Sequence, residues 1–126
     1  MTALDRLGAE KYVLLTTFRK DGRAVATPVW VVRDGDALAV WSAADAGKVK
    51  RIRNIDAVTL APCDFRGNQH ADPVPAHASI SDAAGSAHVR DLLKQKYGVA
   101  GRLTLLGSRL RRGDDGTVGI RIVLDD

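Results

Sequence analysis

A run of cations follows the end of a predicted strand in the segment 41–51. Small residues after Trp41 and Ser42 lead into a predicted helix that carries Lys48, Lys50 and Arg51. Helix N-termini present free backbone N–H groups and bind phosphate. Helical spacing places Lys48 and Arg51 on one face and Lys50 on another, so only one of the two cationic faces can point into a phosphate-binding site. The alternative is a solvated basic face.

A second candidate is the stretch 27–30, where a proline lies inside a predicted strand. Pro28 cannot donate to a β-ladder, so the strand must be a sheet edge there or must break its pairing. Thr27, Val29 and Trp30 then offer a hydroxyl, exposed peptide groups and a flat ring at one point, where a planar heterocycle could dock. In the structural alternative, Pro28 protects a sheet edge and Trp30 fills the core.

Common catalytic and metal signatures are missing from the sequence. It has no G-x-G-x-x-G after a strand, no G-x-x-x-x-G-K-[ST] and no H-E-x-x-H. The three histidines, His70, His77 and His88, lack the spacing of a helical metal pair. Cys63 is the only cysteine, which excludes an internal disulfide and a cysteine-rich zinc site. We expect no bound metal, and the sequence identifies no catalytic side chain.

Six strands are predicted from apolar and β-branched runs bounded by turn residues: 12–17, 23–33, 37–42, 57–62, 74–80 and 117–124. Asp-Gly pairs at 21–22 and 34–35 indicate two successive hairpins. The strands mostly follow one another instead of alternating with helices, which argues against a doubly wound parallel sheet. The pattern predicts a mainly β fold, a small β-barrel with peripheral helices.

Helical periodicity appears in three places. Over 45–54, Val49 and Ile52 would face the core, with Ser42 or Asp45 as the cap. From Ser81 onward, one face carries Val89, Leu92, Leu93 and Tyr97, and Gly98 is placed to end the helix. A further helix closed by Gly113 follows, with one continuous stripe that predicts burial: Val99, Leu103, Leu106 and Leu110.

Size and composition are those of one soluble globular domain spanning 1–126. Hydrophobic residues are 45% and charged residues 27% of the chain, and no apolar run is long enough to span a bilayer. We expect a cytoplasmic protein without a membrane partner. The net charge of +4 is concentrated in 90–112, which holds seven Lys or Arg and one Asp. Such a face could meet nucleic acid, anionic lipid or an anionic small molecule, but a solvated helix face is the favoured interpretation.

Several segments in this order resemble the F420-dependent branch of the pyridoxamine-phosphate-oxidase-like superfamily. They are Thr-Pro-Val-Trp at 27–30, Ser-Ala-Ala-Asp-Ala-Gly-Lys-Val-Lys-Arg-Ile-Arg at 42–53, Ala-Pro-Cys-Asp-Phe-Arg-Gly at 61–67, Leu-Leu-Lys-Gln-Lys-Tyr-Gly at 92–98 and Val-Gly-Ile-Arg-Ile at 118–122. The resemblance covers nearly the whole chain. It implies an FMN-binding type of split β-barrel and a homodimer with two cofactor sites at the subunit interface.

The resemblance also implies which residues contact the cofactor. Lys48, with Ser42, Lys50 and Arg51, would contact the phosphate, and Thr27, Pro28, Val29 and Trp30 would line the ring system, with Trp41 nearby. The basic cluster Arg109, Arg111 and Arg112 could attract the anionic tail of the coenzyme or an anionic substrate.

The implied activity is hydride transfer between the deazaflavin F420 and a small conjugated organic substrate such as an enone, a quinone or a tetrapyrrole. One alternative is an FMN flavoprotein. Another is a non-catalytic protein that binds F420, a flavin or a haem-like ligand. A nucleic-acid-binding barrel is disfavoured, because Tyr97 is the only aromatic residue in the basic segment and single-strand binders need stacking platforms.

Overall fold

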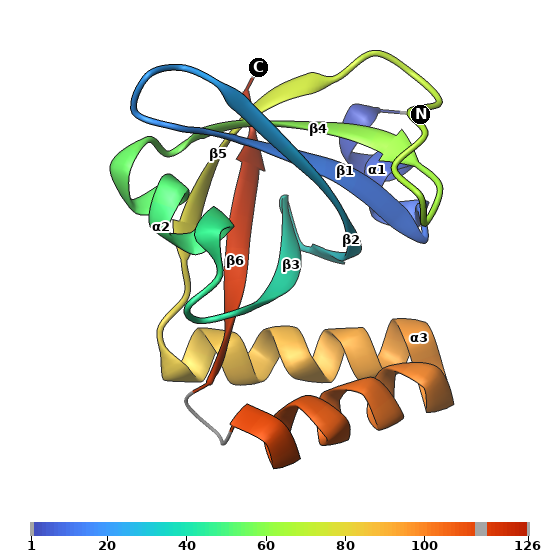
Figure 1. Cartoon of the computed structure of the whole chain (residues 1–126). Helices are drawn as coiled ribbons and strands as arrows, with labels where there is room; N and C mark the ends of the chain where they lie inside the picture. The colour runs from blue at the N-terminus through green and yellow to red at the C-terminus, as the bar shows by residue number, and fades with distance from the viewer. Residues whose placement is uncertain (1, 113–115, 126) are drawn as a thin grey trace.

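Six antiparallel strands form a closed barrel in the computed structural model, which describes residues 2–112 and 116–125, with side chains described outside 108–112. The strand order around the barrel is β1-β2-β3-β6-β5-β4 (Figure 1). Each predicted strand is confirmed to within one residue at either end, and so is the mainly β barrel. The strands are β1 Tyr12–Phe18, β2 Ala24–Asp34, β3 Ala37–Ala43, β4 Ala57–Cys63, β5 Val74–Ile80 and β6 Thr117–Leu124.

Two short helices contribute to the barrel core. Helix α1, Ala3–Ala9, packs against β2, β3 and β4, and helix α2, Gly47–Asn54, packs against β1 and β5. Leu7 of α1 and Val49 and Ile52 of α2 are buried together with the inward side chains of the strands. The inward orientation predicted for Val49 and Ile52 is confirmed. Helix α1 was not predicted, because seven residues carry too little periodicity to stand out.

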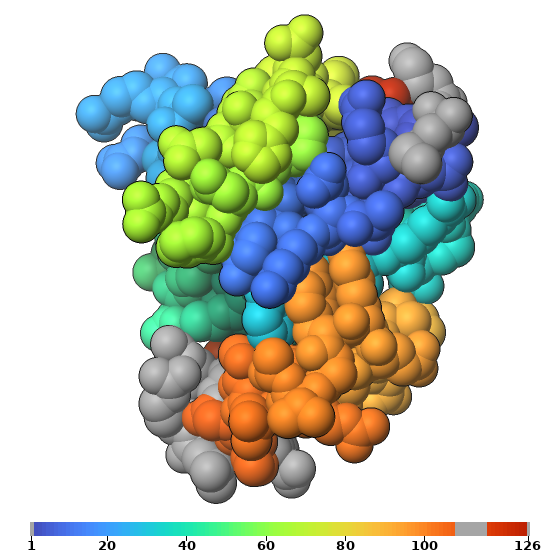
Figure 2. All heavy atoms as spheres, turned by 90° about the vertical axis from the view of Figure 1, so that its right-hand side faces the viewer, coloured from blue at the N-terminus to red at the C-terminus, as the bar shows by residue number. Residues whose placement is uncertain are grey.

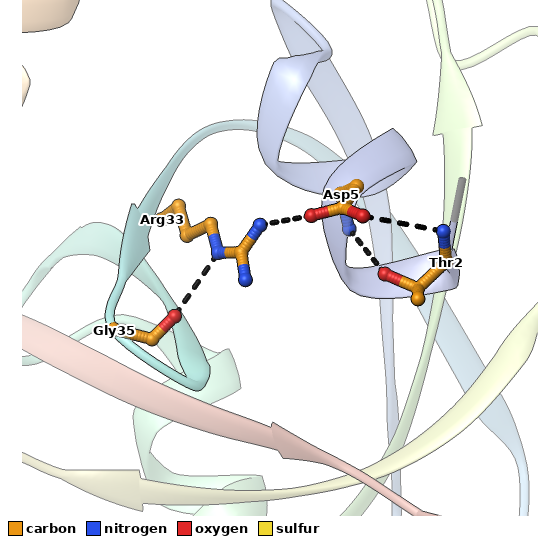
Figure 3. A network of polar contacts seen from close by, with 4 residues as sticks. All are labelled: Thr2, Asp5, Arg33 and Gly35. Carbon is orange, nitrogen blue, oxygen red and sulfur yellow. Dashed lines mark hydrogen bonds and ion pairs between the residues drawn. The ribbon is translucent and has the colours of Figure 1, made fainter.

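The N-terminus of α1 is held by a capping box and an ion pair (Figure 3). The Thr2 hydroxyl accepts a hydrogen bond from the Asp5 amide at 3.1 Å, and the Asp5 carboxylate accepts one from the Thr2 amide at 3.3 Å. Arg33, at the end of β2, pairs with the same carboxylate and donates from Nε to the Gly35 carbonyl at 3.0 Å. The Arg33 guanidinium, followed by the bonds from Thr2, lowers the pKa of Asp5. The pair therefore persists until the pH falls through this lowered pKa.

Strand β2 changes its pairing partners midway. Its residues 24–30 pair with β1, whereas only residues 31–34 pair with β3. Pairing between β2 and β3 stops at Val31 and Val40, although β3 continues to Ala43. Residues 24–30 of β2 and 41–43 of β3 therefore border a split in the sheet. Pro28 lies on this edge, as predicted, where a residue without an N–H costs no ladder bond.

Helix α3, Ala83–Arg112, consists of two arms joined at Gly98, whose φ is 61° and ψ −133° (Figure 1). The predicted helix break at Gly98 is confirmed. The first arm covers the outside of β2, β3 and β6, with Val89 and Leu93 buried. The approach is close at Gly119, where an added Cβ would lie 2.8 Å from Val89 Cγ2.

The burial predicted along the second arm of α3 is wrong. Val99, Leu103 and Leu106 are 72%, 65% and 53% exposed, because the arm packs on the molecule through Leu105, which is 6% exposed. The side chain of Leu110 and all of Gly113 lie outside what the structure describes, as do the side chains of Arg109, Arg111 and Arg112.

Replacing Gly98 by Ala should lower the free energy of unfolding by about 1–3 kcal/mol, the cost of a backbone conformation open essentially to glycine alone. The effect is conformational, since nothing lies within 4 Å of the position that the new Cβ would take. Urea denaturation measures it. Gly107→Ala is the matched control, because that glycine is helical and also has no atom within 4 Å of its Cβ position. A control as destabilised as Gly98→Ala would contradict the conformational explanation.

Candidate functional site

The N-terminus of α2 has no side-chain cap. Ala46 occupies the N-cap position and makes no side-chain capping hydrogen bond. The predicted caps are therefore wrong for Ser42 and Asp45. Ser42 is 5% exposed, and its hydroxyl donates instead to the Ala43 carbonyl at 3.0 Å. The first amides of α2 are thus not occupied by a capping side chain, which suits an anion.

Lys48 and Arg51 lie on the same side of α2, and both are partly buried. Burial lowers the pKa of Lys48, and the nearby Arg51 guanidinium lowers it further. Arg51 Nε donates to the hydroxyl of Thr17 at 2.7 Å, and Thr17 is 1% exposed in β1. Arg51 also folds back over the start of the helix, since a Cβ on Gly47 would lie 2.7 Å from Arg51 Nη1. Two cations and a helix N-terminus therefore meet at one place.

Lys50 is placed apart from this pair. Its side chain is exposed, as is that of Arg53, whereas Lys48 and Arg51 are partly buried. This division follows the helical spacing, which separates the two cationic faces. A ligand that contacts the first turn of α2 would meet Lys48 and Arg51, and Lys50 would point elsewhere.

The predicted ring-binding residues line one edge of the split. Thr27 and Val29 lie opposite Leu15 and Val13 of β1, so they share the interior face of the barrel. Pro28 and Trp30 alternate with them and face outward. The strand end that carries Ser42 borders the same split from the β3 side. The two predicted segments therefore lie on opposite sides of the split and do not pair with each other, and β3 leads from the split toward α2.

Trp30 packs outside the barrel and not in its core. Its ring stacks on Tyr97 of α3, with centroids 4.2 Å apart and planes at 7°. The Tyr97 hydroxyl accepts from the Val31 amide at 3.0 Å and donates to the Lys11 carbonyl at 2.7 Å. Burial raises the pKa of Tyr97 to about 12. A cleft of about 540 Å³ beside this stack is lined by Tyr12, Trp30, Lys96 and Tyr97, among others.

Like Trp30, Trp41 packs against the apolar cluster beneath the first arm of α3. The Arg90 guanidinium is 5.9 Å from its ring centroid, and within the described part of the chain its buried Nε1 has no hydrogen-bond partner. Trp41 lines a different cleft, of about 670 Å³, between the two arms. The sequence-predicted residues thus form separate groups, at the start of α2, along the split and beneath α3.

Sequence reasoning missed three residues that shape these groups. Thr17 holds Arg51, Tyr97 stacks on Trp30, and Arg90 lies over Trp41. Tyr97 was predicted only as part of the core face of its helix. No spacing rule links residues so far apart in sequence, so only the register of the strands and the placement of α3 reveal these contacts.

Two further properties of the described residues bear on function. Their His, Cys, Asp and Glu side chains form no group of three or more that could hold a metal ion. None of the helices in the described ranges combines the length and apolarity that crossing a bilayer requires.

The chain resembles several solved structures but matches no protein-family model and no curated protein in sequence. An FAD-binding protein from Mesorhizobium loti is 18% identical, with a TM-score of 0.68, over 100% of this chain and 91% of that one. A protein described as an F420 reductase is 17% identical, with a TM-score of 0.63, over 100% and 96%. A Listeria innocua protein provisionally named a pyridoxamine 5'-phosphate oxidase is 17% identical, with a TM-score of 0.66, over 99% and 95%. The fold is therefore the split β-barrel of pyridoxamine-phosphate-oxidase-like proteins.

Proposed function

We propose that this protein is an oxidoreductase that binds the deazaflavin F420, with FMN as the alternative cofactor, and acts on a small conjugated organic substrate. The observation that carries the proposal is the pair of partly buried cations, Lys48 and Arg51, at the uncapped start of α2 beside the split. Structural neighbours that are named for F420 reduction and FAD binding support a cofactor of this type.

The residues at hand fit the phosphate of such a cofactor. The first amides of α2 and the cations of Lys48 and Arg51 would hold the phosphate, because charge-assisted hydrogen bonds from several donors are strong. The edge of β2 that includes Pro28 and Val29 would lie along the ring system. When bound, the deazaflavin supplies the hydride chemistry, so the protein has to bind, orient and exclude water.

The outer face of β1, β2 and β4 supports a homodimer with the cofactor between the subunits. Its outward positions carry no charged side chain, which is typical of a surface covered by a partner. Light scattering of the purified protein tests this, and a mass of one chain would contradict it. These positions are Leu14, Thr16, Phe18, Ala24, Ala26, Pro28 and Thr59, and Gly67 of the same chain lies against Leu14 and Pro28.

Fluorescence titration of cofactor-free protein with F420, FMN and FAD in parallel tests the cofactor assignment. We expect micromolar or tighter binding of F420, which would justify a screen of conjugated acceptors with the reduced cofactor. A preference for FMN would move the protein to the flavin alternative. Binding of none of the three would overturn the proposed site.

Cofactor affinity should fall as the pH rises through the lowered pKa of Lys48. In the free protein burial and Arg51 disfavour the charged lysine, whereas a bound phosphate favours it, so binding takes up a proton between that lowered pKa and the higher pKa of the complex. Titrations across the alkaline range measure the slope. In Lys48→Gln the slope from this residue disappears, while the ionisation of the cofactor itself is common to both proteins. An equal slope in both would contradict the assignment.

A further inference from the structure

Three aliphatic side chains form an exposed stripe on the second arm of α3. Val99, Leu103 and Leu106 follow one another at helical spacings of four and three, and they are 72%, 65% and 53% exposed. They are three of the five large hydrophobic residues that the described side chains leave exposed. In Figure 2 this part of the arm, in darker orange below the barrel strands, lies at the molecular surface.

The orientation of the stripe is set by how the arm packs. Leu105 and Gly101 are buried against the rest of the molecule, and a Cβ on Gly101 would lie 3.0 Å from Tyr97 Cβ and 3.1 Å from the Leu93 carbonyl oxygen. The glycine thus permits a close contact between the two arms. Since Leu105 points inward, residues on the opposite side of the helix must point to solvent. Val99 and Leu103 are therefore presented outward by the fold, and Leu106 is 53% exposed at the rim of the cleft between the arms.

The charge of this arm is entirely positive. Residues 99–112 contain four arginines and no acidic residue, and the described Arg102 is exposed. Two neighbouring cations of the first arm are already engaged. Lys96 donates to the carbonyls of Gly8, Glu10 and Val31 at 3.0, 2.5 and 2.6 Å, and Arg90 lies over Trp41. An apolar stripe on an arginine-rich helix would be complementary to a partner that has an anionic surface and an apolar interior.

Three kinds of partner can be compared on this chemistry. A second copy would bring two arginine-rich arms together, and like charges at an interface are repulsive. Single-stranded nucleic acid would find phosphate contacts but no aromatic platform on residues 99–112. An anionic bilayer offers both parts, because headgroup phosphates attract the cations and the acyl boundary receives the aliphatic side chains.

We propose that the second arm of α3 docks on the surface of an anionic membrane, with the exposed stripe in the acyl boundary and Arg102 at the headgroups. This revises the expectation of a protein without a membrane partner and requires no spanning segment. Three aliphatic residues give only shallow, reversible and salt-sensitive binding. None of these residues belongs to the proposed cofactor site, so the two proposals stand or fall separately.

Sedimentation with vesicles of phosphatidylcholine alone, and of phosphatidylcholine with phosphatidylglycerol, tests the proposal on the full chain. We expect binding to the anionic vesicles only, weakening as salt is added. The double variant Leu103→Ser with Leu106→Ser should bind at least about tenfold more weakly, since it loses much of the apolar area that enters the bilayer. Val123→Ser is the matched control, because Val123 is 45% exposed but lies on β6.

Each other outcome would overturn the proposal. Absence of binding to anionic vesicles, or equal binding to neutral ones, would remove the lipid partner. A double variant that still sediments as wild type would assign binding to another surface. A change in oligomeric mass without vesicle binding would assign the stripe to contacts between copies. Circular dichroism and urea denaturation establish that the double variant is folded, so loss of binding can be read as loss of the stripe.

Discussion

Lys48→Ala should weaken cofactor binding about 10- to 150-fold, which corresponds to about 1.5–3 kcal/mol for a hydrogen bond to a charged group. The reason is that Lys48 is partly buried beside Arg51 at a helix start without a side-chain cap. In the free protein, burial and the neighbouring Arg51 destabilise the charged form of Lys48. A bound phosphate stabilises that charged form, so removing Lys48 should weaken phosphate binding. Fluorescence titration of both proteins with the same cofactor measures the change.

Arg53→Ala is the matched control for this substitution. It removes an equal charge from the same helix, but Arg53 is exposed and lies in the last turn. A loss of long-range attraction alone would affect both variants alike and would vanish at high salt. A direct contact predicts that only Lys48→Ala loses affinity and that the loss survives salt. Unchanged affinity in a folded Lys48→Ala protein would remove Lys48 from the site.

Leu7→Ala should lower the free energy of unfolding by about 2–5 kcal/mol, the range for truncating a buried leucine and leaving a cavity. Leu7 is 0% exposed and packs into the barrel core from α1. The seven residues of α1 are too few for a stable isolated helix, so the burial of Leu7 stabilises both the helix and the barrel. Urea denaturation with a two-state fit gives the difference.

Arg6→Ala provides the comparison on the same helix. Arg6 is exposed, and alanine is a strong helix former, so we expect a change of about 0.5 kcal/mol or less. If both variants lost the same small amount, α1 would not be an integral part of the core. If Arg6→Ala lost as much as Leu7→Ala, helix stability and not burial would be responsible.

The strands were predictable because their signals are local. Apolar and β-branched runs bounded by turn residues located each strand to within one residue, and Asp-Gly pairs marked two hairpins. A proline without an N–H indicated the free edge of β2. The placement of the α2 cations on two different faces of the helix also follows from local spacing. A rotation of 100° per residue separates Lys48 and Arg51 from Lys50 whatever the helix packs against.

The tertiary structure decided what no local pattern encodes. Whether an apolar helical stripe is buried depends on which side of the helix faces the molecule after the chain reverses at Gly98. Here the side that carries Leu105 faces inward, and Leu103 is exposed to solvent. Likewise Trp30 stacks on Tyr97, and Arg51 bonds to Thr17, only because barrel closure brings distant segments together. The sequence by itself determined the six strands, the helices after the first one and their chemical groups. Their partners depended on packing, because burial and hydrogen bonding are settled between segments and not within them.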